Sequence, residues 1–275
     1  MRFERRILDD VLDDVIVASK YFRNHTTLFI GDSNSLVLPT EDLIKILDTI
    51  YAMFPKMERV TSYARAKTIA KGKTVEELKE LHKHGLSRLH IGLETGDDDL
   101  LKIISKGATS ADMIEGGKKV VESGISLCFY VMPGLGGREH SKQSAENTAR
   151  VINAVNPNFI RIRTFQAIPR TPLWEMIQKG EITPLSPEEM LQEEYELIQG
   201  LENVTSNYVS DHLLNYHVWE NGRPKQLDGK LPEDKPKMLA LLENSLKAMK
   251  EDPVAKAYYE RHRALREARG QIGTL

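Results

Sequence analysis

Three segments rich in glycine and short polar residues follow apolar runs, and they hold the first candidates for ligand binding. In chain order they are Gly31-Asp32-Ser33-Asn34, Gly92-Leu93-Glu94-Thr95-Gly96 and Met132-Pro133-Gly134-Leu135-Gly136-Gly137. A parallel α/β barrel or sheet binds its ligands at the carboxyl ends of its strands. Three such segments at successive strand ends therefore predict one ligand-binding rim.

The glycines of these segments also allow a purely structural interpretation. A tight turn from a strand into a helix can require a backbone conformation that glycine adopts without steric cost. Tight turns would explain Gly31, Gly92, Gly134 and Gly136 as well as close approach of a ligand would. From the residues alone, both interpretations stay open.

Two arginines and one histidine are further candidates for contacts with a substrate. Arg161 and Arg163 alternate along a predicted strand, so they share one face and could meet a carboxylate or phosphate there. If that face points outward, both side chains are only solvated. His212 follows Asp211 in a predicted turn, where the two could act as an acid and base pair or serve in capping and packing.

The cysteine and histidine residues do not predict a metal site. Cys128 is the single cysteine, and its apolar neighbours Leu127 and Phe129 predict a small core residue rather than a ligand. His82 and His84 are two residues apart in a predicted helix, so they point to different faces. One cysteine excludes an intramolecular disulfide, which agrees with a reducing compartment.

Hydrophobic periodicity predicts that helices and strands alternate through the first two thirds of the chain. Strands are predicted to start near residues 27, 60, 87, 125 and 159, with helices in the intervals. Thr74 and Glu77 form a predicted capping box, and Gly85 and Gly124 follow helix ends. Intervals of about 28 to 38 residues are typical of βα repeats.

Because each return passes through a helix, the five strands are predicted to be parallel. Five strands favour an open or partial (β/α) barrel over a closed one and leave an edge strand exposed. A helix over about residues 5–22 precedes the first strand, which is the pattern of a βα unit without its strand. The predicted fold class is α/β, a partial TIM-barrel-like (β/α) barrel missing its first strand.

The sequence changes character after Thr164. Prolines mark an irregular passage, and Ser186-Pro187-Glu188-Glu189 then begins a strong helix. Two amphipathic helices near 234–250 and 253–269 follow. We therefore predict a barrel core over residues 1–175 and a mainly helical C-terminal extension over residues 176–275.

The charges of the chain nearly balance, with 38 Lys and Arg against 40 Asp and Glu and a net charge of -2. This balance gives no clear nucleic-acid signal. No apolar run reaches the roughly 18 to 20 residues that a membrane span needs, and the N-terminus lacks a secretory pattern. We expect a cytoplasmic protein with no membrane partner.

The order and spacing of the strand-end segments resemble the radical S-adenosylmethionine (radical SAM) superfamily, in its coproporphyrinogen-dehydrogenase-like and methylthiotransferase-like branch. The resemblance runs from Leu28 to about Lys235. It rests on Gly31-Asp32-Ser33-Asn34, on Ile91 to Gly96 followed by Leu100 and Lys106-Gly107, and on Met132-Pro133-Gly134 through Glu139.

The resemblance implies that SAM lies along the strand ends. The glutamate of the family's Gly-Gly-Glu loop is absent here. By position, the implied contacts are Gly31, Asp32 and Ser33 with the amino group of the SAM methionine, Glu94 and Thr95 with the ribose or the methionine carboxylate, and Met132 and Gly134 with the adenine.

The resemblance also implies a 4Fe-4S cluster, held by three cysteines spaced Cys-x3-Cys-x2-Cys after the first strand. In the family, the open iron binds SAM and passes it an electron, and the resulting 5′-deoxyadenosyl radical abstracts hydrogen from a substrate. With Cys128 alone, this chain lacks those ligands. The expected function is that of the SAM-binding half of such an enzyme, truncated and inactive alone.

Two other hypotheses stay open at this stage. The chain could be a cluster-free barrel that acts as a SAM-binding or scaffold protein. It could instead be an ordinary (β/α) barrel enzyme that acts on a phosphorylated small molecule at the glycine loops. The substrate is a small molecule of unknown kind. A second copy of the chain or a complementing N-terminal fragment is the expected partner at the exposed strand edge.

Overall fold

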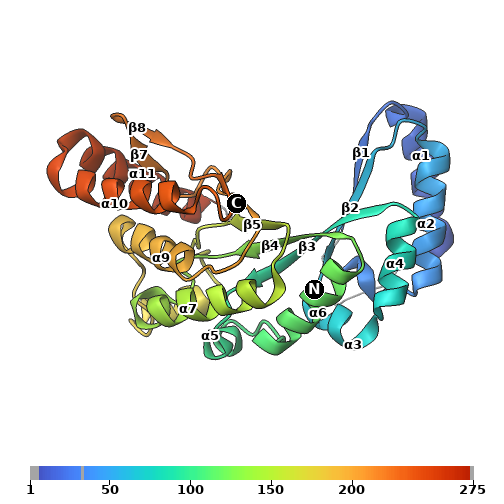
Figure 1. The fold of residues 1–275 in the computed structure, drawn as a ribbon, viewed down its shortest axis with the longest axis horizontal. Coiled ribbons are helices and arrows are strands. Elements are labelled where there is room, and N and C mark those ends of the chain that lie inside the picture. The colour runs from blue at the N-terminus through green and yellow to red at the C-terminus, as the bar shows by residue number, and fades with distance from the viewer. Residues whose placement is uncertain (1–5, 32–33, 273–275) are drawn as a thin grey trace. The chain divides into compact units, whose positions relative to one another are not determined.

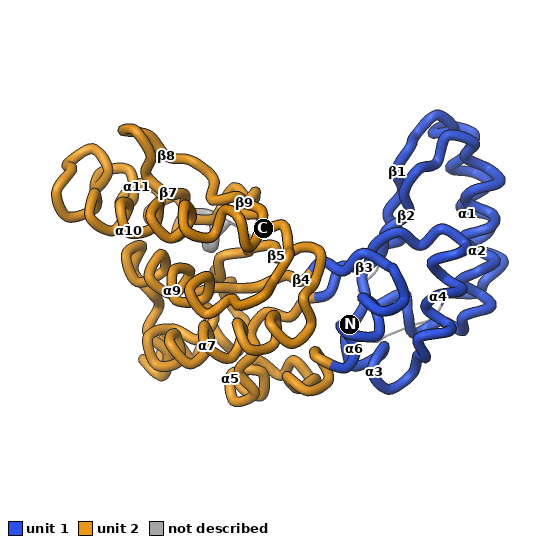
Figure 2. The backbone as a smooth tube through the Cα atoms, in the orientation of Figure 1, with its two compact units in different colours: residues 1–91, 115–128 blue, residues 92–114, 129–275 orange. Residues whose placement is uncertain are grey.

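The predicted strands and helices are present in a computed structural model, which describes residues 6–31 and 34–272 (Figure 1). The chain divides into two compact units (Figure 2). Residues 1–91 and 115–128 make up the first unit, and residues 92–114 and 129–275 make up the second. Three elements have residues in both units: β3 (Leu86–Glu94), α6 (Ser110–Glu122) and β4 (Ser126–Val131).

The first unit is built from parallel strands and the helices that connect them. Its complete strands are β1 (Thr27–Ile30) and β2 (Arg59–Ala64). Its complete helices are α1 (Leu8–Phe22), the short 3-10 helix η1 (Ser35–Val37), α2 (Thr40–Met53), α3 (Ala66–Gly72) and α4 (Val75–Lys83). β1 pairs in parallel with β2, and β2 pairs in parallel with β3. This pairing confirms the βα repeat for the first three predicted strands.

The second unit continues the alternation and adds strands that the periodicity did not predict. Its strands after β4 are β5 (Phe159–Ile162), β6 (Asn207–Val209), β7 (Val218–Glu220), β8 (Arg223–Lys225) and β9 (Gly229–Lys230). Its complete helices are α5 (Asp98–Ile103), α7 (Gly137–Val155), α8 (Pro172–Gln178), α9 (Pro187–Gln199), α10 (Lys235–Glu251) and α11 (Pro253–Ile272). β6 pairs in parallel with β5 and antiparallel with β9, so the segment predicted as a mainly helical extension also supplies two strands to the sheet. The division at residue 175 stays a prediction.

The sheet is open rather than closed into a barrel. Its strand order is β1-β2-β3-β4-β5-β6-β9, and β7 and β8 form a separate hairpin, among the residues that the structure describes. This order confirms the predicted open α/β arrangement. β1 is an edge strand, and its Phe29 is 44% exposed. Association of a second copy or a fragment at this edge stays a prediction.

The apolar stripes of the helices pack where their periodicity predicts. α2 buries Leu43, Ile46, Leu47 and Ile50. Burial of such a stripe, more than intrinsic helix propensity, stabilises a helix of this length. Cys128 is buried in β4, as its apolar neighbours predict. None of the described helices is both long enough and apolar enough to cross a membrane.

Replacing Thr74 by Ala is expected to lower the free energy of unfolding by about 1 kcal/mol, because it removes the N-cap of α4. The Thr74 hydroxyl accepts the Glu77 N–H, and the Glu77 carboxylate accepts the Thr74 N–H, so both halves of the predicted capping box are present. Urea unfolding measures the change. Lys79→Ala, at an exposed position of the same helix, serves as the control and should leave stability nearly unchanged.

Candidate functional site at the strand ends

A main-chain hydrogen bond joins the ends of β3 and β4 in the second unit. The Met132 N–H donates to the Glu94 carbonyl oxygen at 2.8 Å. Glu94 ends β3 with a φ of 62°, a left-handed conformation that residues other than glycine seldom adopt. Such strain persists only where surrounding contacts fix the residue, and it is common at ligand sites. The structure thus brings together two residues that were predicted to contact one ligand.

The Glu94 side chain forms an ion pair with Lys106. The Lys106 ammonium donates to Glu94 Oε1 at 2.8 Å, and the side chains of Lys106 and Glu94 are 23% and 18% exposed. Gly92 makes room for this pair, because a Cβ at residue 92 would lie 2.2 Å from Glu94 Oε1 and 2.9 Å from Lys106 Nζ. Close approach of side chains therefore explains this glycine. Lys106 is a site residue that the sequence pattern alone did not identify.

Thr95 is fully buried, and its hydroxyl is used within the fold. Its Oγ1 lies 2.9 Å from Ser144 Oγ and accepts the Asp97 N–H at 3.1 Å. Thr148 of α7 accepts the Gly96 N–H at 2.8 Å. These bonds fasten the segment after β3 to α7, so Thr95 helps to hold Glu94 in place. A direct contact of Thr95 with a ligand stays a prediction.

Gly134 lies in the loop after β4, and a glutamate of α9 holds that loop. The Gly134 N–H donates to Glu193 Oε1 at 3.1 Å, and the Ser141 hydroxyl donates to Glu193 Oε2 at 2.6 Å. Glu193 is buried, and burial raises its pKa to about 7. Gly134 has a φ of 82°, so the turn interpretation holds for this glycine.

Glu193 is the second site residue that the sequence pattern alone did not identify. It and Glu194 are buried in α9 together with the apolar residues Met190, Leu191, Leu197 and Ile198. Acids among the buried positions of an amphipathic helix are the signal that would have found them, because a buried carboxylate needs its own partners. Glu194 accepts a hydrogen bond from the Tyr208 hydroxyl at 2.7 Å, and burial raises its pKa to about 7.

Gly31 directly follows β1 in the first unit, and there is free space where a side chain would begin. Among the described residues, nothing lies within 4 Å of a Cβ built at this position, and its φ is not positive. Crowding by the described residues therefore does not explain this glycine, and its contact with a ligand stays a prediction. The Gly31 carbonyl accepts a hydrogen bond from the Ser35 hydroxyl at 3.2 Å. Asp32 and Ser33, the other residues predicted here, lie outside the described residues.

Arg161 of β5 and Arg163, which directly follows that strand, both bind one carboxylate of this chain. Arg161 Nε donates to Asp211 Oδ1 at 3.0 Å, and Arg163 Nη1 donates to the same oxygen at 3.1 Å. These hydrogen bonds, the one from Arg161 foremost, lower the pKa of Asp211 to about 2. A contact of the two arginines with a substrate stays a prediction.

His212 has a structural contact in the turn that follows Asp211. Its Nδ1 accepts the Leu214 N–H at 3.4 Å. Burial, together with the positive charge of Arg163, lowers the pKa of His212. The Asp211 carboxylate accepts its hydrogen bonds from the two arginines. His212 thus has a contact within the turn, and both its role as an acid and base and its role in capping or packing stay predictions.

Replacing Asp211 by Asn is expected to lower the free energy of unfolding by about 1 kcal/mol at neutral pH, because two arginines lose their carboxylate. Water screens the cluster, since the Asp211 side chain is 33% exposed, and this keeps the effect small. Urea unfolding measures the loss. In the control Glu146→Gln, which breaks an exposed pair with Lys142 at 3.9 Å, stability should not change. An equal result for both variants would show that the arginine cluster contributes nothing.

The residues present do not fit an iron-sulfur cluster. Within the described ranges, no group of three or more His, Cys, Asp or Glu side chains is placed to hold a metal ion. Cys128 is buried in β4, and the cluster of this family requires three thiolates. The strand ends do fit SAM. Glu94 and Lys106 supply charges of both signs, and the partly buried Met132 supplies a thioether that can pack on an aromatic ring.

Comparison with known proteins identifies the family of this chain. The model of the Radical SAM superfamily matches residues 2–149. The heme chaperone HemW of Bacillus subtilis is 28% identical over 177 residues, which cover 63% of this chain and 45% of that protein. The tRNA uridine(34) acetyltransferase of Methanocaldococcus infernus is 26% identical over 123 residues, which cover 42% of this chain and 22% of that protein. The solved structure of coproporphyrinogen III oxidase (HemN) from Escherichia coli has a TM-score of 0.52 at 15% identity and covers 70% of this chain and 43% of that chain.

This chain spans less than half the length of each of these curated relatives. The likeness to HemN, at 15% identity, shows the fold alone. The matched family segment contains Gly31, Glu94, Lys106 and Met132 and extends over more than half of the 275 residues. The chain belongs to the radical SAM superfamily.

Proposed function

We propose that this chain binds SAM through its strand-end loops and forms the SAM-binding part of a radical SAM protein. The ion pair of Glu94 and Lys106 is the observation that carries the proposal, because it holds two opposite, partly buried charges at the end of β3, where the Glu94 main chain bonds to Met132. A carboxylate accepts hydrogen bonds from ribose hydroxyls, and an ammonium pairs with the carboxylate of the SAM methionine. The ribose hydroxyls and the methionine carboxylate both belong to SAM, so one bound SAM could meet both charges.

The remaining proposed contacts follow the predicted positions. Met132 and Gly134 lie along the adenine, with the Met132 thioether against the ring. Contacts of Gly31, Asp32 and Ser33 with the amino group of the methionine also remain part of the proposal. Arg161, Arg163 and His212 remain proposed contacts of a substrate. Glu94 is the main proposed contact after β3, because Thr95 is buried, and a contact of Thr95 remains part of the proposal.

We further propose that the chain alone does not cleave SAM reductively. The cluster would supply the electron for that cleavage, and the residues present do not hold it. Its three cysteines would have to come from a segment or partner outside this sequence. The alternative is a cluster-free SAM-binding or scaffold protein. The burial of the single cysteine agrees equally well with this alternative and with the SAM-binding part of a larger enzyme. The activities of the heme chaperone and the acetyltransferase are only candidate activities for this chain. A location in the cytoplasm is likewise part of the proposal.

Anaerobic reconstitution with iron and sulfide tests the cluster part of the proposal. The purified chain should retain far fewer than four irons per polypeptide after desalting, and its affinity for SAM in calorimetry should be the same before and after reconstitution. Retention of about four irons and four sulfides would overturn this part. A Cys128→Ser variant distinguishes adventitious iron on the thiol from a bound cluster, because only iron on that thiol should be lost.

A further inference from the structure

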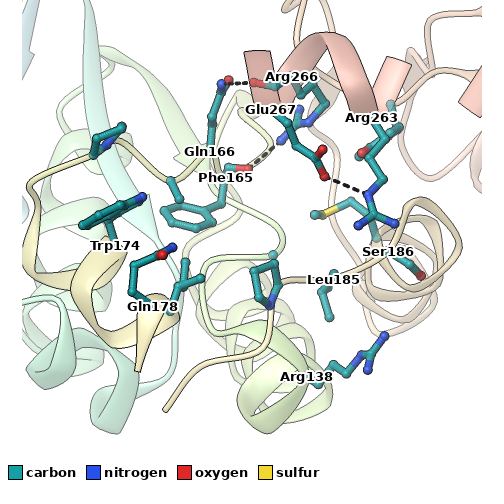
Figure 3. Close-up of a pocket in the computed structure, with 17 residues that line it drawn as sticks. Arg138, Phe165, Gln166, Trp174, Gln178, Leu185, Ser186, Arg263, Arg266 and Glu267 are labelled. Atoms are coloured by element: carbon teal, nitrogen blue, oxygen red, sulfur yellow. Dashed lines mark hydrogen bonds and ion pairs between the residues drawn. The ribbon is translucent and has the colours of Figure 1, made fainter. Parts of the chain in front are cut away.

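We infer that the second unit holds a pocket, bordered on one side by Gly134 of the proposed SAM site, that binds an organic monocarboxylate with a flat apolar body. The pocket has a volume of about 310 Å³, within the range of small-molecule sites (Figure 3). Its walls come from the loops after β4 and β5, from α8, from the start of α9 and from α11. The inference does not depend on SAM binding.

A buried arginine without a carboxylate partner is the main evidence. Arg266 of α11 lines the pocket and is 7% exposed. Its Nη2 donates to the Phe165 carbonyl at 2.6 Å, and its Cζ lies 4.9 Å from the centre of the Tyr216 ring. Its Nη1 is buried and has no hydrogen-bond partner in the part of the chain that the structure describes. A buried cationic N–H without a partner costs free energy, which an anion bound to the Arg266 guanidinium would relieve.

The charges around the pocket leave one positive charge uncompensated. Arg138 pairs with Glu189 at 2.6 Å, and Arg263 pairs with Glu267 at 2.9 Å. Among the described residues, no carboxylate forms an ion pair with Arg266. Tyr216 does not compensate the charge, because burial raises the pKa of its phenol and keeps it neutral.

One uncompensated charge matches a monoanion. Arginine stays protonated in proteins, although burial lowers the pKa of Arg266. A carboxylate carries one negative charge and accepts two parallel N–H bonds. A phosphate monoester carries about 1.5 to 2 negative charges at neutral pH, so it would leave an excess of negative charge inside the pocket. The charge count therefore favours a carboxylate over a phosphate.

The rest of the lining fits an apolar, aromatic body. Three aromatic side chains line the pocket, from Phe165, Trp174 and Tyr216. Aliphatic and thioether groups fill the spaces between them, and they come from Ile177, Leu185 and Met190. Aromatic rings give large contact areas with a flat ligand and favour offset or edge-on stacking. Arg266 lies close to Phe165 (Figure 3) and over the Tyr216 ring, so one ligand could reach both the cation and these rings.

Calorimetry without SAM tests the inference, with 2-naphthoate as the probe and the neutral 2-naphthamide as its isostere. The full chain should bind 2-naphthoate at least about tenfold more tightly than 2-naphthamide, because the amide lacks the charge that pairs with Arg266. Equal affinities, or no binding of 2-naphthoate by the folded chain, would overturn the inference. If SAM still binds in that case, the proposed SAM site is unaffected.

Variants of α11 assign the effect to one side chain. Arg266→Met keeps the aliphatic length and should weaken 2-naphthoate by at least about tenfold without weakening 2-naphthamide. Arg266→Lys keeps the charge and should retain part of the preference. Arg261→Met, at an exposed position of the same helix, is the matched control and should bind as the wild type does. Unchanged 2-naphthoate affinity in Arg266→Met would overturn the inference, and circular dichroism verifies the fold of each variant.

Discussion

Gly92→Ala is expected to weaken SAM binding by about tenfold or more, because the added methyl group displaces the Glu94 and Lys106 side chains. The new Cβ would lie 2.2 Å from Glu94 Oε1 and 2.9 Å from Lys106 Nζ. Both of those atoms are the ends of flexible side chains, so they can move without unfolding the protein. We therefore expect the melting temperature to change little while the dissociation constant rises.

The control for this prediction is Gly72→Ala in α3 of the first unit. Among the described residues, no atom lies within 4 Å of a Cβ at this position, so the substitution should leave SAM binding unchanged. Calorimetric titration with SAM compares the two variants, and differential scanning calorimetry compares their stability. A Gly92→Ala protein that binds SAM like the wild type would show that the ion pair takes no part in the site.

The stability of the chain is expected to fall as the pH rises from 5 to 8, because two buried carboxyl groups must lose their protons. Burial raises the pKa values of Glu193 and Glu194 from 4.5 to about 7. The folded state therefore binds protons more tightly than the unfolded state between these values. The corresponding stability is fully present below about 4.5 and is lost as the pH rises through about 7. Each group contributes on the order of 3 kcal/mol to this loss.

Glu194→Gln should remove much of this pH dependence, because an amide resembles the protonated acid and stays neutral. Gln can still accept the Tyr208 hydroxyl bond at that position. Unfolding in urea at pH 5 and pH 8 should give equal stabilities for variant and wild type at the lower pH and a more stable variant at the higher pH. Glu188→Gln, at an exposed position of α9, should keep the wild-type slope. A wild-type stability that rises from pH 5 to pH 8 would contradict the account.

The fold was largely predictable from periodicity and caps. The five predicted strands and the helices between them are all present, since each carries several residues of regular apolar spacing. β6 and β9 were not predicted, because they have three and two residues, too few for an alternation to appear. Their pairing depends on contacts between segments distant in sequence, as with the bond from the Ser210 N–H to Asp228. Local sequence patterns do not indicate such long-range contacts.

The site was predictable only in part. Glu94, Met132 and Gly134 were found because they follow strands, and strand ends are recognisable in the sequence. Lys106 and Glu193 were not found, because their roles arise from partners that folding brings together at 2.8 Å and 3.1 Å. Arg161 of β5 and Arg163 just after it both reach Asp211, but nothing in the local sequence identified Asp211 as their shared partner.

Methyl NMR of the chain labelled with [13C-methyl]methionine tests the central claim most directly, that SAM binds at the strand ends without a cluster. Met132→Leu identifies the Met132 signal. On titration with SAM in the absence of iron, the Met132 methyl signal should shift and saturate, because the adenine ring lies against it. The signals of Met53 in α2 and Met249 in α10 should not shift. An unchanged Met132 signal at near-millimolar SAM, with the protein folded, would contradict the account.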